Sequence, residues 1–138
     1  MEPGRTTVLE IAVRSWMLDM YNQVSNTKFL EFLEEARFQF FEGFFESGNV
    51  WGEGLALLLV NAHLDYRSAA HLGDTLEVET AFCRLGEKSL TLEHKIRKKG
   101  QQEVVVEGQM TFVLKDLKKG VAVPIEGKLR EMLVHGKC

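Results

Sequence analysis

The feature that most constrains the fold is one long amphipathic helix, predicted from Phe29 to Phe44. At about 100° per residue, the apolar side chains of this segment form one stripe: Phe29, Phe32, Leu33, Ala36, Phe40 and Phe44. The acidic side chains fall on the opposite, solvated face: Glu31, Glu34, Glu35 and Glu42. A second apolar group lies on the flank between the two faces: Leu30, Phe38, Phe41 and Phe45. Core packing is the simpler explanation of this flank, and a partner subunit or an acyl chain is the alternative.

Strand patterns precede and follow this helix. Residues 7–13 predict a first strand, and an irregular stretch follows from about residue 17 to 25. The apolar run Leu55–Val60 predicts a strand buried on both faces that continues to Tyr66. Alternating patterns predict three more strands at residues 74–82, 89–96 and 104–114, and a short helix at Lys128–Val134. This order predicts an α+β fold in which one helix packs on an antiparallel sheet.

Composition limits the classes of function. The 138 residues fit a single domain spanning residues 1–138. A net charge of −3 lacks the basic bias of nucleic-acid-binding proteins. The longest apolar run, Leu55–Val60, is far shorter than the roughly 20 residues of a membrane-spanning helix. Residues 1–7 lack the apolar segment of a signal peptide, so we expect the cytoplasm. Cys83 and Cys138 show no CxxC spacing and are predicted to be free thiols.

Several common catalytic motifs are missing from the sequence. It contains no GxSxG nucleophile motif, and Gly52-Glu53-Gly54 lacks the third glycine of a dinucleotide-binding loop. The four histidines have no metal-ligand spacing, so neither a metal nor a cofactor is predicted: His63, His71, His94 and His135. The basic run Lys95–Lys99 is followed closely by Glu103 and Glu107, which favours a solvated hairpin over a nucleic-acid surface.

Asp19 is the strongest candidate for chemistry. Its carboxylate belongs to the mostly apolar segment Trp16–Tyr21, just before the predicted helix. Burying a carboxylate costs free energy unless the group is paired or used in a reaction. An exposed aspartate in a turn is the simpler alternative, and Asp19 alone does not decide between them.

Asp19 also belongs to a set of segments that extends over nearly the whole chain. These segments are Val13–Asn26, Phe29–Arg37, Val60–Arg67, Leu72–Leu76, Leu85–Ser89 and Glu126–Glu131. In this order they resemble the hot-dog-fold acyl-CoA thioesterases, in which an Asp precedes a GHVNN-like turn and a Y-L-x-F-x-E-x-A-R helix. The chain is most similar to the long-chain acyl-CoA thioesterases of the 4-hydroxybenzoyl-CoA thioesterase-like group. It departs from their pattern at four positions: Asn22 for Gly, Gln23 for His, Ser25 for Asn and Phe29 for Tyr.

The resemblance implies a fold and an assembly. One long central helix would be wrapped by a five-stranded antiparallel sheet, with a short helix at the C-terminus. Two chains would pair their sheet edges, so that each active site lies across the interface of a homodimer or of a homotetramer built as a dimer of dimers.

The resemblance also implies a reaction, the hydrolysis of a medium- to long-chain fatty acyl-CoA thioester to the free acid and coenzyme A. Asp19 would act as nucleophile or general base. The first N–H groups of the helix, near Asn26, would polarise the thioester carbonyl. Gln23 would donate a hydrogen bond where the usual His stands, but it cannot exchange a proton near neutral pH.

Substrate contacts follow from the same resemblance. Lys88 and Ser89, with Arg84 just before them, are the candidates for binding coenzyme A, and Arg67 is a weaker one. Four apolar or aromatic side chains and one amide complete the predicted set of substrate contacts: Tyr21, Phe29, Leu33, Leu58 and Asn61. The acyl chain would run along the helix and the Leu55–Val60 strand.

Two other functions remain open at this point. A hydratase on the same fold would place a catalytic His on or beside the central helix, and the predicted helix contains no His. A non-catalytic module that binds acyl-CoA or an acyl carrier protein is the second alternative, because the usual His is missing.

Overall fold

The computed structural model describes residues 6–42, 54–127, 130 and 131. Its elements follow in this order: β1 (Thr6–Ala12), a short 3-10 helix η1 (Ser15–Met17), α1 (Asn26–Glu42), β2 (Leu55–Tyr66), β3 (Thr75–Leu85), β4 (Ser89–Lys98), β5 (Val104–Asp116) and β6 (Val121–Ala122). The predicted α+β order is confirmed. Among the described residues, no helix has both the length and the apolar character needed to span a membrane.

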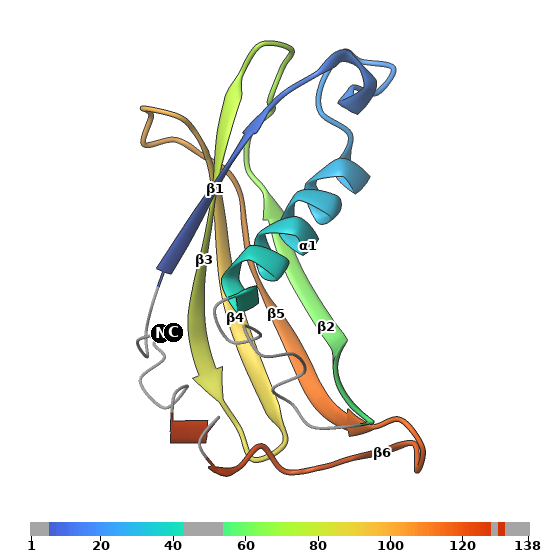
Figure 1. Cartoon of the computed structure of the whole chain (residues 1–138). Helices are drawn as coiled ribbons and strands as arrows, with labels where there is room; N and C mark the ends of the chain where they lie inside the picture. Colours follow the sequence, from blue (N-terminus) through green and yellow to red (C-terminus); the bar gives the residue numbers. More distant parts are fainter. Residues whose placement is uncertain (1–5, 43–53, 128–129, 132–138) are drawn as a thin grey trace.

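The strands form one antiparallel sheet with the order β1-β3-β4-β5-β2, and β6 pairs with β5. α1 lies diagonally across one face of this sheet, with its N-terminal end toward β2 (Figure 1). The sheet therefore has six strands instead of the five predicted. The sixth strand, β6, has only two residues and is too short to produce an alternating pattern.

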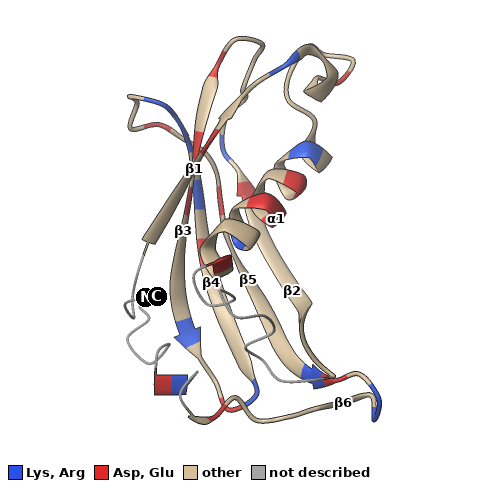
Figure 2. Ribbon diagram, in the orientation of Figure 1, with Lys and Arg blue, Asp and Glu red and all other residues tan. Residues whose placement is uncertain are grey.

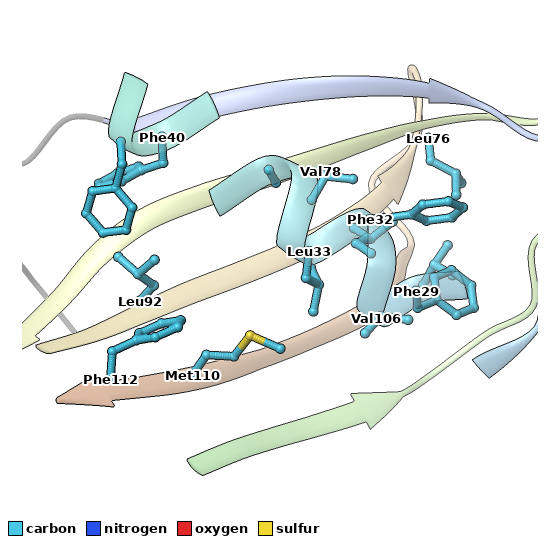
Figure 3. Close-up of a cluster of buried hydrophobic side chains, with 14 of the residues drawn as sticks. Phe29, Phe32, Leu33, Phe40, Leu76, Val78, Leu92, Val106, Met110 and Phe112 are labelled. Carbon is cyan, nitrogen blue, oxygen red and sulfur yellow. The ribbon is translucent and has the colours of Figure 1, made fainter. Parts of the chain in front are cut away.

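The core lies between α1 and the sheet, as Figure 3 shows. The helix contributes six buried side chains: Phe29, Phe32, Leu33, Ala36, Phe40 and Phe41. They meet apolar side chains that alternate along β3, β4 and β5, among them Leu76, Val78, Leu92, Val106, Met110 and Phe112. The predicted stripe is confirmed for its described members, since Phe44 lies outside the described residues. Truncating a fully buried leucine such as Leu33 to alanine costs about 2–5 kcal/mol.

The apolar flank of α1 is only partly covered. Phe41 is buried, but the side chains of Leu30 and Phe38 are 41% and 58% exposed. Phe45 lies outside the described residues. Core packing therefore explains Phe41 and leaves Leu30 and Phe38 as partly exposed apolar side chains.

β2 is an edge strand, which corrects the prediction that Leu55–Val60 is buried on both faces. Leu58, Leu59 and Val60 are 38%, 47% and 56% exposed, and the pairing with β5 shifts register between Leu59 and Asn61. A continuous apolar run predicts burial on both faces, but it does not say whether the covering surface belongs to the same chain. Edge strands are usually protected by charges, yet β2 carries none from Leu55 to Leu64 (Figure 2).

Three further predictions can be compared with the structure. α1 begins at Asn26, three residues before the apolar stripe starts at Phe29, and this is where the resemblance places the first N–H groups of the helix. Of the predicted helix at Lys128–Val134, only Arg130 and Glu131 are described, and both are helical, as is Gly127. Cys83 is buried and disulfide-bonded, so the prediction of a free thiol is wrong there, while Cys138 lies outside the described residues.

Candidate active site

Asp19 lies in a small closed loop between η1 and α1. Leu18 and Val24 form an isolated antiparallel bridge. Inside it, the Asp19 N–H donates to the Gln23 carbonyl over 2.8 Å, and the Asn22 N–H donates to the Asp19 carbonyl over 3.1 Å. Asn22 adopts a left-handed conformation with φ of 61°, which asparagine tolerates better than most residues. The loop geometry is thus set by local backbone bonds.

Only one of the two oxygens of the Asp19 carboxylate accepts hydrogen bonds from described residues. Its Oδ1 accepts hydrogen bonds from the N–H groups of Tyr21 at 2.9 Å and Gln23 at 3.2 Å. Its Oδ2 has no hydrogen bond to any described residue. The side chain is therefore held in one orientation, and one carboxylate oxygen remains available to a substrate or a water molecule.

The start of α1 offers hydrogen-bond donors next to this loop. Ser25 immediately precedes the helix, and its carbonyl accepts from the N–H groups of Lys28 at 3.0 Å and Phe29 at 3.4 Å. The N–H groups of Asn26 and Thr27 have no acceptor among the described residues. They carry the positive end of the helix dipole, so they can stabilise negative charge on a carbonyl oxygen.

Two contacts tie this region to the sheet. The Val24 N–H donates to the Ala70 carbonyl over 2.9 Å, and the Tyr66 hydroxyl donates to the Asn26 carbonyl over 3.4 Å. The Tyr66 ring also lies 6.1 Å from the ring of Phe29, centroid to centroid. Tyr66 has no role in the sequence prediction, although it directly precedes Arg67 in one of the matching segments.

The loop surface is apolar and open. Trp16, Met20 and Tyr21 are 67%, 84% and 74% exposed, and Gln23 is exposed as well. The apolar residues near Asp19 therefore do not bury it within one protomer. They form a surface beside the carboxylate that another molecule can cover.

The structure separates the predicted substrate contacts into several groups. Phe29 and Leu33 are core residues with 3% and 0% exposure, so the prediction that they contact an acyl chain is not supported by their placement. Leu58 and Asn61 lie on the exposed edge strand β2. Arg67 is engaged in ion pairs with Asp65 and Glu107, at N···O distances of 3.5 Å and 2.9 Å.

The remaining candidates lie at the opposite end of the protomer from Asp19. The Val13 N–H donates to the Asp74 carbonyl, so the Asp19 loop adjoins the start of β3. Arg84 lies near the end of β3, Lys88 lies in the turn that follows, and Ser89 is the first residue of β4 (Figure 1). The 11 residues of β3 separate the two ends by about 33 Å. One protomer therefore does not bring Asp19 and Lys88 into a single site.

The turn around Lys88 is well anchored. Within the turn, the Gly86 N–H donates to the Ser89 carbonyl over 2.9 Å. Two distant N–H groups also donate to its carbonyls, that of Ile125 to Glu87 over 2.8 Å and that of Leu114 to Lys88 over 3.0 Å. The N–H groups of Glu87 and Lys88 have no acceptor among the described residues. Consecutive free N–H groups beside a lysine form a favourable environment for an anion.

One buried polar group was not singled out by the sequence analysis. His94 is 1% exposed, its Nδ1 lies 3.0 Å from the Thr80 hydroxyl, and its Nε2 has no hydrogen-bond partner. Burial, with a smaller contribution from the positive charge of Arg37, lowers the pKa of His94 to about 4. The alternation of His94 with Leu90, Leu92 and Ile96 in the sequence was the signal that it faces the core. No group of side chains suited to a metal ion occurs among the described residues.

A hot-dog-type sheet and helix, with an aspartate loop before the helix N-terminus, define a protein of the thioesterase type. The chain belongs to the Thioesterase-like superfamily, which it matches over residues 13–133. It is 37% identical over 124 residues to the long-chain acyl-CoA thioesterase FadM of Escherichia coli (strain K12), covering 90% of this chain and 94% of the relative. The resemblance noted in the sequence is thereby confirmed.

Solved structures agree with this assignment. The YbaW probable thioesterase from Escherichia coli superposes with a TM-score of 0.79 at 36% identity, covering 91% of this chain and 94% of that one. A 1,4-dihydroxy-2-naphthoyl-CoA thioesterase from Synechocystis superposes with a TM-score of 0.77 at 22% identity, covering 88% of this chain and 90% of that one. The second likeness supports the fold alone.

Proposed function

We propose that this protein hydrolyses the thioester bond of fatty acyl-CoA, of medium to long chain, to the free acid and coenzyme A. The family and the FadM relative support the reaction class and the acyl-CoA substrate. The observation that carries the proposal is the Asp19 carboxylate, held by two backbone N–H groups through Oδ1 and open at Oδ2. It lies seven residues before a helix start with two free N–H groups.

The chemistry needs an attacking group and a site for the oxyanion. The N–H groups of Asn26 and Thr27 would stabilise the charge that develops on the thioester oxygen. Oδ2 of Asp19 would either attack the carbonyl carbon, giving a mixed anhydride that water then cleaves, or remove a proton from an attacking water. In both routes the C–S bond breaks and the coenzyme A thiolate leaves, taking up a proton. Gln23 would orient the substrate or the water with its amide.

Coenzyme A would bind at the Lys88 turn. The Lys88 ammonium, the Ser89 hydroxyl and the free N–H groups of Glu87 and Lys88 supply donors for a phosphate. Exposed Arg84 is a further cation beside them. Arg67 is a poorer candidate because two carboxylates already neutralise it.

We propose that a complete site needs two chains. The supporting observations are the placement of Asp19 and Lys88 beyond opposite ends of β3, a strand about 33 Å long, and the uncharged, exposed edge of β2. Antiparallel pairing of two β2 edges about a two-fold axis would bring the Asp19 end of one chain toward the Lys88 end of its partner. Leu58 and Asn61 would then lie at the interface, and Tyr21, with Leu30 and Phe38, would offer apolar surface to the partner or to the acyl chain. A dimer of dimers would use a different surface, because the two-fold pairing occupies the one β2 edge of each chain.

Complementation between two impaired variants tests this arrangement. Asp19→Asn and Lys88→Ala chains are mixed, unfolded and refolded together, and acyl-CoA hydrolysis is measured at substrate concentrations well below KM. If Asp19 and Lys88 of one site come from different chains, one intact site forms in each mixed dimer, restoring about a quarter of the wild-type rate. Activity equal to the mean of the two separate variants would reject the shared site, and a monomer in light scattering at micromolar concentration would reject the assembly.

A non-catalytic module that binds acyl-CoA or an acyl carrier protein is the alternative, because Gln23 replaces the usual His. A thiol-release assay with acyl-CoA substrates from acetyl to palmitoyl separates the two functions. Thiol release supports hydrolysis, and tight binding without release supports the module. We place the protein in the cytoplasm because its proposed substrate is an intracellular coenzyme A thioester. Fractionation of cells that express the chain tests that placement.

A further inference from the structure

Arg130 connects the C-terminal segment to the turn proposed to bind coenzyme A. Its Nη1 donates to the Gly86 carbonyl and to the Ile125 carbonyl, both over 3.0 Å. The side chain is partly buried, and 44 residues separate it in sequence from Gly86. The matching segment Glu126–Glu131 has no other role in the site described above.

The bond to Gly86 completes the anchoring of the turn. The carbonyls of Glu87, Lys88 and Ser89 all accept backbone N–H groups. The Gly86 carbonyl is the member of this set that is bound by a side chain, and that side chain carries a full positive charge. Hydrogen bonds from a charged donor are about twice as strong as neutral ones, so Arg130 contributes a strong restraint on the turn.

Gly86 and Ser89 are also in close contact. A Cβ atom added to Gly86 would lie 2.6 Å from the Ser89 hydroxyl oxygen. The Ser89 hydroxyl therefore lies close to Gly86, so the position of the Gly86 peptide limits where this hydroxyl can lie. By holding the Gly86 peptide, Arg130 restrains the Ser89 hydroxyl and the adjoining Glu87 N–H group. Its own contacts do not involve the substrate.

We propose that Arg130 is a positioning residue for coenzyme A binding. By holding the Gly86 carbonyl against the Ile125 segment, it fixes the Lys88 ammonium, the Ser89 hydroxyl and the free N–H groups in the arrangement that binds a phosphate. The planar guanidinium suits this task, because it can bridge two carbonyls at once. This inference rests on the proposed binding of coenzyme A at the turn.

The test compares Arg130→Met and Arg130→Lys with two thioesters of the same acyl chain. One is the acyl-CoA, and the other is the S-acyl N-acetylcysteamine, which has no phosphate. We expect Arg130→Met to raise KM for acyl-CoA about fivefold, the scale of one ordinary hydrogen bond, because the effect on the ligand is indirect. Its kcat and its KM for the truncated thioester should stay unchanged, and Arg130→Lys should recover part of the loss. Arg97→Met, which removes an ion pair with Glu79 on β3, is the matched control and should leave KM unchanged.

A double-mutant cycle with Lys88→Ala identifies the route of the effect. If Arg130 acts through the turn, Arg130→Met raises KM less in the Lys88→Ala background than in wild type, because one of the donors that it positions is already absent. Three outcomes would each overturn the proposal. The first is an equal rise in KM for both thioesters, and the second is an effect of Arg130→Met on KM that is the same with and without Lys88. The third is a lower thermal stability of Arg130→Met with unchanged KM.

Calorimetric titration with coenzyme A alone keeps this inference separate from the proposed hydrolysis. Weaker binding by Arg130→Met than by wild type supports the positioning role even if no thioester is cleaved. Equal binding by the two proteins contradicts it even if hydrolysis is confirmed.

Discussion

The two ends of the protomer are built in different ways. The Asp19 loop is closed by bonds among its own residues, from Leu18 to Val24. The Lys88 turn is fixed from outside, by backbone bonds from Leu114 and Ile125 and by the side chain of Arg130. The reactive carboxylate therefore depends on local sequence, whereas the turn depends on residues far away in the chain.

The two ends share one property. Each end has polar groups without a hydrogen-bond partner among the described residues, next to backbone groups that are hydrogen-bonded. These groups are Oδ2 of Asp19 and the N–H groups of Asn26 and Thr27 at one end, and the N–H groups of Glu87 and Lys88 at the other. A polar group without a partner is costly once it is buried, so these groups are suited to a ligand that completes them. Within one protomer the two halves lie at opposite ends of β3, a strand about 33 Å long.

The largest effect is expected from the core between the two ends, and it should alter stability without altering either end. The folded pKa of His94 is about 4, below the roughly 6.5 of an unfolded histidine. The unfolded chain therefore binds the extra proton first as the pH falls. The stability contribution of neutral His94 is complete above pH 6.5 and is lost between about pH 6.5 and 4, by about 3 kcal/mol.

Urea unfolding at several pH values measures this loss. The variant His94→Asn cannot titrate in this range, so its unfolding free energy should vary less between pH 7 and 4 than that of wild type. The comparison uses the slope of the unfolding free energy against pH, so it remains valid if the variant is less stable at every pH. Identical slopes for the two proteins would show that His94 is not the group responsible.

The next largest effect should arise at the Asp19 end. Asp19→Asn keeps the shape of the side chain and removes the carboxylate, so hydrolysis should fall at least about a hundredfold, the scale of losing a general base. Its Oδ1 can still accept from the N–H groups of Tyr21 and Gln23, so the thermal unfolding midpoint should be close to wild type. Near-normal turnover in this variant would remove Asp19 from the mechanism.

The contrast between the ends also explains what the sequence could predict. The helix stripe and the alternating strands were predicted correctly because a 3.6-residue or a 2-residue period records which face is buried. The same logic failed for β2, because the apolar run Leu55–Val60 does not tell whether a second chain supplies the cover. Phe29 and Leu33 were assigned to substrate by resemblance, although their own periodicity already placed them in the core.

The site residues also divide into those that local sequence predicts and those that depend on distant parts of the chain. Asp19 was found because its loop is local and its motif is continuous in sequence. The bond from Arg130 to Gly86 spans 44 residues, and no local pattern encodes such a contact. The separation of Asp19 from Lys88 likewise depends on the strand order, which the sequence pattern alone does not fix.

A smaller effect is expected at the Lys88 end. Lys88→Ala removes one exposed charge from the turn and leaves its backbone bonds, so KM for acyl-CoA should rise about tenfold, with kcat little changed. The difference between variant and wild type should shrink at high salt, because an exposed charge is screened. A loss of kcat with KM unchanged would move Lys88 from substrate binding to the reaction itself.

The smallest effect concerns Gln23, where this chain departs from the usual His. Its backbone N–H and carbonyl hold the Asp19 loop, and its exposed side chain makes no hydrogen bond to a described residue. Replacing the amide by an imidazole should therefore leave the loop intact and change turnover less than about tenfold, or under roughly 1.4 kcal/mol of barrier. The reason is that an amide and an imidazole can donate the same hydrogen bond to substrate or water. Rate profiles of Gln23→His and wild type against pH, with one long-chain acyl-CoA, decide the matter. A large gain in activity with a new ionisation near pH 6.5 would show that the His of the relatives carries a proton, and that this chain lacks that step.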